Sequence, residues 1–267
     1  MMDRFLASRR LQGIVPWILP ALVLMSWEIA ADAGWLQARV LSAPSAVAVA
    51  FWQTLADGTL VHNVAVSTGR ALQGLVLGGL IGLALGVVNG VWRPADLLLD
   101  STLQMLRNVP HLAIIPLVIL WFGIGEGAKI FLVTIGVVFP VYINTYHGIR
   151  TVDPALVEMA RVYGLGPVER FWRVILPGAL PSIFVGLRYG LGIMWLTLIV
   201  AETISASSGI GYMTMNAREF LQTDVILLGV ILYAVLGKLS DIVVKFFERA
   251  ALQWHPSYVR PRREAFA

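Results

Sequence analysis

The sequence contains no cysteine and little charge. Without cysteine the chain has no disulfide and no thiolate ligand for a metal ion. Asp, Glu, Lys and Arg make up 13% of the 267 residues, whereas a soluble domain has about 25%. Hydrophobic residues make up 58%, and the mean hydropathy is +0.77. The low charge therefore points to lipid as the main solvent, and no stretch is polar enough for a separate soluble domain.

Motifs for catalysis and nucleotide binding are absent as well. Gly237-Lys238 is followed by Leu239 and lacks the upstream glycine of a phosphate-binding loop, so we expect no ATPase site in this chain. No Gly-x-Ser-Gly or His-Glu-x-x-His protease motif is present. The four histidines lack the spacing of metal ligands; they are His62, His111, His147 and His255. We expect no catalytic residue and no metal site.

Apolar runs recur along the whole chain. A helix needs roughly 20 apolar residues to cross the hydrocarbon layer. The sequence predicts an all-α integral membrane protein with about six transmembrane helices, at 14–31, 71–92, 101–122, 128–149, 182–200 and 225–247. Together they form a membrane domain at 14–247, between an N-terminal tail at 1–13 and a C-terminal tail at 248–267. Two amphipathic segments, 44–60 and 211–222, are expected at the membrane interface.

Two of these runs are less regular than the others. The first follows three arginines, and Ala31-Asp32-Ala33 has the form of a signal-peptide cleavage site. Its spanning length and Glu28 favour a retained helix over a cleaved signal. The third run reaches spanning length only if a helix that begins near Ser101 continues through Pro110 and Pro116.

Glycine is regularly spaced in the second run. Residues four apart lie on one face of a helix, so such glycines leave a smooth groove that another helix backbone can enter. We expect this helix-packing role for Gly74, Gly78, Gly82, Gly86 and Gly90.

The few charges predict an orientation. Fourteen of the 20 Lys and Arg fall on the side of the N-terminus and four on the other side, which places both termini in the cytoplasm by the positive-inside rule. Arg188 lies within the fifth span, and Lys238 and Asp241 are three apart in the sixth, where they are expected to neutralise each other. The basic character thus reflects topology, and a nucleic-acid partner is not expected.

The longest cytoplasmic loop, 150–181, contains two short helix patterns. Asp153 and Pro154 suit a helix start, and Gly164 suits its end, with positive φ. Apolar residues recur on one face at Leu156, Met159, Ala160 and Tyr163, and a second stripe follows Pro167. From the pattern alone, such a helix either lies on lipid headgroups or seats in a groove of a partner protein.

The same loop resembles a known signature. Glu158-Met159-Ala160, three residues, Gly164, nine residues and Val174-Ile175-Leu176-Pro177 are similar to the E-A-A, three, G, nine, I-x-L-P loop of ABC importer permeases, with Met159 and Val174 as mild departures. Further segments resemble the sulfonate, taurine and nitrate branch of these permeases, and the aliphatic sulfonate permeases above all, from about Pro16 to Trp254. These segments are 104–111, 117–124, 142–144, 201–205 and 216–224.

The resemblance implies a type I ABC importer permease fold and a role as the membrane subunit of an ATP-driven importer for aliphatic sulfonates in the bacterial inner membrane. It implies a second permease copy, two ATPase subunits that bind ATP and magnesium, and an extracytoplasmic solute-binding protein; no cofactor is expected in this chain. Coupling to the ATPase is expected at Glu158, Met159, Ala160, Tyr163, Gly164, Leu176 and Pro177.

A passage for a sulfonate needs hydrogen-bond donors and positive potential without tight binding. Polar residues in or near the spans are the candidates, and Arg188 either lines the inner passage or pairs with an acid such as Glu202. The candidates are Arg107, Asn108, His111, Asn144, Arg188, Thr197 and Glu202. Two alternatives remain: a permease for taurine, nitrate or another small solute of the branch, and an ion-coupled secondary carrier, which needs ionisable residues at mid-membrane.

Overall fold

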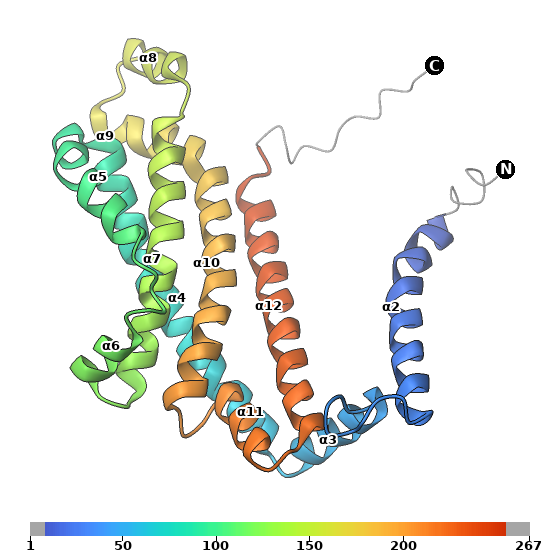
Figure 1. The fold of residues 1–267 in the computed structure, drawn as a ribbon. Coiled ribbons are helices and arrows are strands. Elements are labelled where there is room, and N and C mark those ends of the chain that lie inside the picture. The colour runs from blue at the N-terminus through green and yellow to red at the C-terminus, as the bar shows by residue number, and fades with distance from the viewer. Residues whose placement is uncertain (1–8, 255–267) are drawn as a thin grey trace.

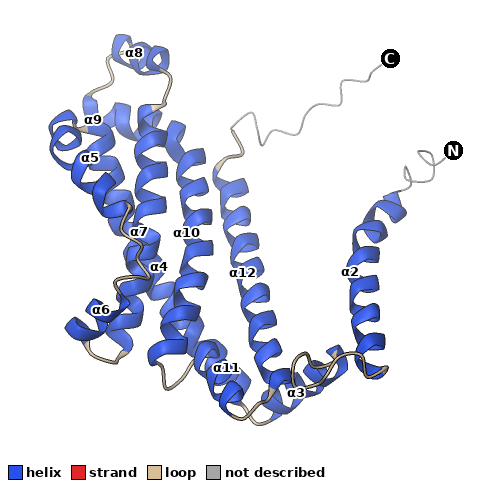
Figure 2. Ribbon diagram, in the orientation of Figure 1, coloured by secondary structure: helices blue, strands red, loops and turns tan. Residues whose placement is uncertain are grey.

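The computed structural model describes residues 9–254, and this part of the chain is helical with no strand. Figure 2 shows helices joined by short loops. In chain order the elements are α2 (Arg9–Asp32), α3 (Pro44–Ala56), α4 (Thr59–Val91), α5 (Arg93–Arg107), α6 (Ile115–Phe122), α7 (Glu126–Arg150), α8 (Pro154–Val162), α9 (Pro167–Arg170), the π-helical turn η1 (Phe171–Ile175), α10 (Leu176–Ser205), α11 (Ile210–Glu219) and α12 (Thr223–Ala251).

The long helices run between two ends of the molecule (Figure 1). One end carries α8 and α9, together with the start of α2 and the end of α12, whereas α3 and α11 lie at the other end. Four helical runs are long and apolar enough to cross a membrane: Thr59–Val91, Glu126–Arg150, Pro167–Ile204 and Thr223–Ala251. They contain the expected fourth, fifth and sixth spans and all but the last residue of the second, and the 24-residue α2 contains the first. The tail predictions at 1–8 and 255–267 lie outside the described residues.

The expected third span is not one helix. The chain leaves α5 after Arg107, turns through 108–114 and enters the eight-residue α6 at Ile115. Pro110 has no N–H to donate and disfavours helical angles at the residue before it. The prediction of a continuous helix over 101–122 is therefore wrong, although Pro116 is tolerated because it lies in the first turn of α6.

Two other helix boundaries differ from those expected from hydropathy. α4 begins at Thr59, so residues 59–70, which mix polar and apolar side chains, belong to the helix rather than to the loop. α9, η1 and α10 follow one another without a gap, and α10 already begins at Leu176. Pro181, the expected end of the loop, lies inside α10. Hydropathy marked the apolar part of each helix and missed the polar turns that continue it.

The five regularly spaced glycines of α4 all face α7. An added methyl group at Gly82 would lie 2.6 Å from the carbonyl oxygen of Val138, and one at Gly86 would lie 2.5 Å from Cβ of Thr145. Gly74, Gly78 and Gly90 meet α7 in the same way. Only hydrogen fits at these positions, so the backbones of α4 and α7 approach closely along their length. We call this contact the glycine seam.

Apolar side chains cover the outside of the long helices. Leu80 of α4 and Leu239 of α12 are more than half exposed, as expected where lipid is the solvent. In α2, the polar Glu28 has a specific partner, because its carboxylate accepts a hydrogen bond of 3.0 Å from the backbone N–H of Ser45. Ser45 lies in the first turn of α3, where helix N–H groups have no internal partner. Glu28 thus joins the apolar α2 to the start of α3.

Candidate functional site

α8 is a short helix with firm ends. Asp153 accepts a hydrogen bond of 2.8 Å from the N–H of Ala155, which caps the start of the helix. At its end, Gly164 has φ +80 and the N–H of Leu165 bonds to the carbonyl of Ala160 at 3.0 Å. This is the glycine-terminated helix end known as a Schellman motif. Positive φ at Gly164 was expected from the sequence, and the structure confirms it.

The apolar face of α8 is mostly open. Met159 is 49% exposed and Tyr163 is 77% exposed, whereas Ala160 is buried at 3% where α8 packs on α9 and η1. Val162, which the sequence reading did not single out, is 82% exposed. Leu156 and Glu158 are exposed as well. Ala160 therefore packs α8 against the rest of the molecule, while its neighbours are exposed. The helix α8 itself lies at the tip of the fold (Figure 1).

The second half of the signature loop joins α8 to a long helix. The π-helical turn Phe171–Ile175 leads directly into α10. Leu176 packs with Ile149 of α7 and with Ile183, and Pro177 stands in the first turn of α10, where a missing N–H does no harm. α8 thus packs on α9 and η1, which continue into α10 as one uninterrupted helical run.

The candidate path residues do not gather in one place. Arg107 and Asn108 lie exposed at the end of α5. His111, in the turn after α5, lies 2.9 Å from the buried hydroxyl of Thr197 on α10. Asn144 donates to the carbonyl of Pro140 within α7, which is an ordinary intrahelical contact. Arg188 and Glu202, both on α10, belong to two separate charged groups.

Glu202 lies in a buried polar group at the end of the molecule that carries α11. Its carboxylate accepts hydrogen bonds from the Ser67 hydroxyl at 2.8 Å, Arg70 Nη1 at 2.7 Å, the Gly211 N–H at 2.9 Å and the Tyr233 hydroxyl at 3.0 Å. These donors belong to α4, α11 and α12. A buried carboxylate with this many donors is held in place, so Glu202 braces four helices.

Arg70 completes this group from its other side. Its guanidinium also bonds to both carboxylate oxygens of Glu126 and to the carbonyl and hydroxyl of Ser208. Lys129 donates to Glu126 at 3.0 Å. The two cations and two carboxylates balance, which is the condition under which ionic side chains are buried at acceptable cost. Glu202, named as one possible acidic partner of Arg188, pairs with Arg70 instead.

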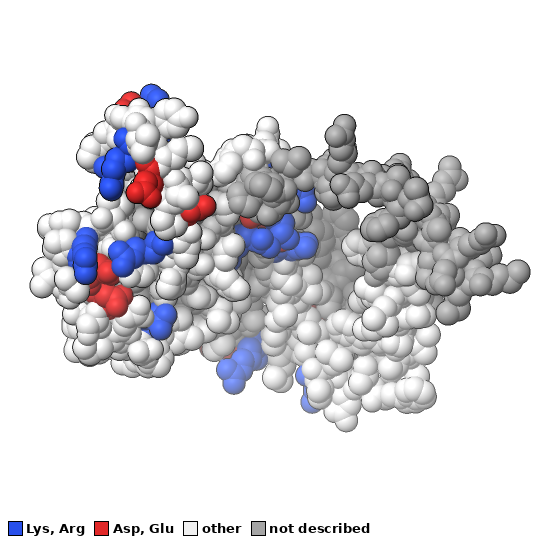
Figure 3. All heavy atoms as spheres, turned by 90° about the horizontal axis from the view of Figure 1, so that it is seen from above, with Lys and Arg blue, Asp and Glu red and all other residues white. Residues whose placement is uncertain are grey.

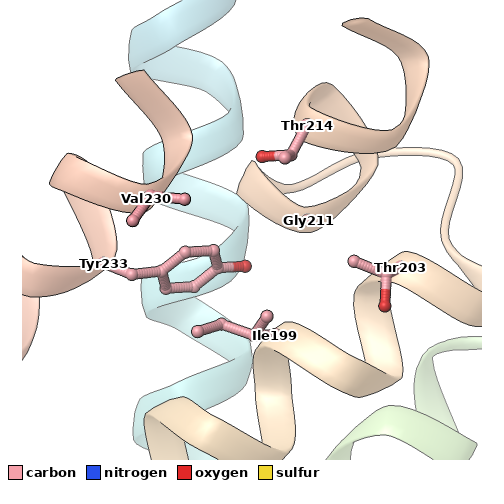
Figure 4. Close-up of a pocket in the computed structure, with 6 residues that line it drawn as sticks. All are labelled: Ile199, Thr203, Gly211, Thr214, Val230 and Tyr233. Carbon is pink, nitrogen blue, oxygen red and sulfur yellow. The ribbon is translucent and has the colours of Figure 1, made fainter. Parts of the chain in front are cut away.

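Sequence reasoning missed this group because it treated Arg70 as a loop residue ahead of the second span. The signal was present, because residues 59–70 contain no proline and continue directly into the apolar run. No feature of the sequence pointed to Tyr233, because a single tyrosine in a span usually serves only to pack against its neighbours. Figure 4 shows it pointing its hydroxyl from α12 toward the corner of α10 and α11, in a pocket of about 150 Å³.

Arg188 belongs to an open charged group between α10 and α12. Its Nε lies 3.3 Å from Asp241 and its Nη1 lies 3.7 Å from Glu248. Lys245 lies 2.7 Å from the second oxygen of Asp241. The expected neutralisation of Asp241 by Lys238 is one contribution among several, because an Arg from another helix and a Lys one turn later supply the close contacts. A cavity of about 420 Å³ lies beside them, lined by Val185, Arg188, Tyr189 and Asp241.

Seen from the end that carries α8, the Lys and Arg side chains of the described residues form several separate groups (Figure 3). A surface that binds nucleic acid has its basic residues clustered on one face or along one helix. Within residues 9–254 no group of three His, Asp or Glu side chains is placed to hold a metal ion.

Comparison with known proteins gives consistent matches. The family model described as "Binding-protein-dependent transport system inner membrane component" matches residues 74–253. The chain is 59% identical over 245 residues to the "Putative aliphatic sulfonates transport permease protein SsuC" of Escherichia coli (strain K12), covering 92% of this chain and 93% of that protein. It is 46% identical to the protein of the same name from Bacillus subtilis (strain 168), with 90% and 87% covered.

A solved structure of the MetNI methionine ABC transporter in an inward-facing conformation superposes with a TM-score of 0.62. The superposed region covers 72% of this chain and 96% of the matched transporter chain, with 22% sequence identity, so the two chains share a fold.

Proposed function

The chain belongs to the family of binding-protein-dependent transport system inner membrane components, and we propose that it is the permease subunit of an ATP-driven importer of aliphatic sulfonates. The face of α8 carries this proposal: Met159, Val162 and Tyr163 are apolar and exposed on a helix that is capped at both ends. In water such side chains favour burial against a partner. The aliphatic sulfonate assignment comes from the relatives with 59% and 46% identity.

The partner at α8 is an ATPase subunit. A short helix with a half-exposed apolar face fits a groove, as in other helix-in-groove contacts. The coupling residues are Glu158, Met159, Tyr163 and Gly164 on this helix, with Ala160 behind them. Through η1, Leu176 and Pro177, closure of the ATPase on ATP reaches α10 and changes access from one side of the membrane to the other.

The assembly contains two copies of this permease and two ATPase subunits in the bacterial inner membrane. The start of α2 and the end of α12 lie at the same end of the molecule as α8 (Figure 1). This supports placing both termini in the cytoplasm with the ATPase. The opposite end, with α3 and α11, is where an extracytoplasmic binding protein would deliver substrate. ATP and magnesium bind to the ATPase, and this chain needs no cofactor.

Taurine, nitrate or another small solute of the branch would use the same machinery, and the binding protein would decide among them. An ion-coupled carrier fits less well, because it needs a carboxylate that takes up and releases an ion. Glu202, within α10, is instead occupied by four donors.

The test is uptake into proteoliposomes that contain the permease with its ATPase, with a binding protein added outside. We expect labelled ethanesulfonate to accumulate only with ATP inside the vesicles and only with the ATPase present. Taurine and nitrate serve as competitors in the same assay. Accumulation driven by an ion gradient without ATPase would refute the importer, and uptake of taurine or nitrate alone would correct the substrate.

A further inference from the structure

Arg70 of α4 and Arg188 of α10 have different surroundings. The side chain of Arg70 is 3% exposed and bonded to Glu126, Glu202 and Ser208. The side chain of Arg188 is 38% exposed, with Asp241 at 3.3 Å and Glu248 at 3.7 Å as longer, less complete contacts. A solute anion has no access to Arg70, but it reaches Arg188 from the 420 Å³ cavity.

The cavity face does not suit contact with lipid. Arg188 is the thirteenth of the 30 residues of α10, and Asp241 is the nineteenth of the 29 residues of α12. Both helices are of spanning length and apolar. Asp241 and Lys245 remain 30% and 38% exposed. Ionisable side chains at this depth face water-filled passages or partners rather than hydrocarbon.

The chemistry of the cavity matches an anion with an apolar tail. Arg188 presents a planar fork of donors, which suits tetrahedral and planar oxyanions. Apolar surface is offered by Val185, one turn before Arg188, and by Tyr189, directly after it. The volume of about 420 Å³ falls in the range of small-molecule sites. Arg188 and Lys245 contact the carboxylates of Asp241 and Glu248. Lys238, one turn before Asp241, interacts electrostatically with it and adds a third positive charge, so the group as a whole is net positive for an incoming anion.

We propose that this cavity is a transient binding site for the headgroup of an alkanesulfonate, and that Asp241 sets its affinity by competing for Arg188. The inference rests on the proposed function. The sulfonate replaces Asp241 as the partner of Arg188, and Asp241 returns when the sulfonate moves on. The carboxylate thus keeps binding weak enough for release, which a passage requires.

Three variants in the complete transporter test this exchange, with ethanesulfonate uptake as the readout. Asp241→Asn removes the competitor, so KM should fall about threefold to tenfold while maximal uptake also falls because release is slower. Arg188→Gln should reduce uptake at least about tenfold, and the double variant R188Q/D241N should stay equally low because the guanidinium that binds the headgroup is gone. The control is Arg249→Gln, which removes a charge of α12 that lies outside the cavity lining and should leave uptake unchanged.

A purely structural ion pair gives the opposite result. Each single variant then breaks the pair and lowers uptake, and the double variant recovers uptake, which would overturn the inference. If R188Q is lost from the membrane, the KM of D241N decides, and an unchanged or higher KM refutes the proposal. Failure of the wild-type transporter to take up ethanesulfonate would instead refute the proposed substrate, so the two failures are told apart.

Discussion

At the scale of single residues, Glu202 shows how ionic side chains are accommodated inside an apolar bundle. Its carboxylate receives donors from three other helices and balances Arg70. Removing one partner of such a pair costs more than the pair contributes, because the remaining charge stays buried without compensation. The residue is therefore important for folding even though its charge suggests a role in transport.

Glu202→Gln tests this assignment. The change keeps one acceptor oxygen but removes the negative charge beside Arg70, so we expect a loss of about 3–5 kcal/mol of stability. Thermal unfolding of the purified protein in detergent measures it. The control is Glu169→Gln, which breaks a surface pair of 3.5 Å with Arg173 and should cost no more than about 1 kcal/mol. A stable E202Q protein with no transport would instead place Glu202 in the passage.

Gly164 makes a second prediction at this scale. Its φ of +80 is costly for residues with a Cβ and most costly for branched ones. Gly164→Val should therefore distort the end of α8 and abolish ATP-driven uptake, while the amount of protein in the membrane stays normal, because no atom lies within 4 Å of an added Cβ. Gly166→Val, at φ −65 and equally unhindered, is the control. Normal uptake by G164V would contradict the role of α8.

At the scale of elements, the glycine seam sets the spacing of α4 and α7. Gly82→Ala would bring a methyl group within 2.6 Å of the Val138 carbonyl oxygen, a contact that requires the helices to separate. We expect a loss of about 1–3 kcal/mol, as for other overpacked interiors, measured by thermal unfolding in detergent. Gly79→Ala is the control, since nothing lies within 4 Å of the added carbon. Equal unfolding temperatures would show that the seam is not tight.

The helices also show which features of the fold could be predicted from the sequence. The spacing of four in α4 predicted a groove, but it did not name α7 as the helix that fills it, because a period describes one helix only. Local spacing likewise suggested Lys238 as the partner of Asp241, whereas Arg188 is 53 positions away in the chain and is brought close by the packing of α10 on α12. Periodicity predicts faces, and only the fold pairs them.

Helix breaks were harder to predict than helix faces. Pro110 interrupts the expected third span, while Pro140 and Pro181 lie inside α7 and α10 without ending them. The difference is one of context. Neighbouring helices hold α7 and α10 on several sides, which compensates the lost hydrogen bond. The segment 108–114 lacks that support on its exposed side, where Asn108 and Val109 are open.

At the scale of the whole molecule, α8 and α11 lie at opposite ends (Figure 1). The absence of cysteine makes this directly testable, because a single introduced thiol has no background. Tyr163→Cys and Phe220→Cys place thiols at positions that are 77% and 69% exposed in the wild type. In intact spheroplasts, an impermeant maleimide should label the variant at 220 and not the variant at 163. Labelling in the reverse pattern would invert the proposed orientation.

The glycine seam has a further consequence for how the transporter changes state. Backbones that touch over the length of two helices cannot slide without collision. Two side-chain contacts also join α10 to α12: Tyr233 donates a hydrogen bond to Glu202, and Arg188 pairs with Asp241. Little therefore remains among α4, α7, α10 and α12 that can shift independently. In the proposed dimer, the subunit therefore behaves as one moving part, and the gate is the boundary between two such bodies that rotate against each other.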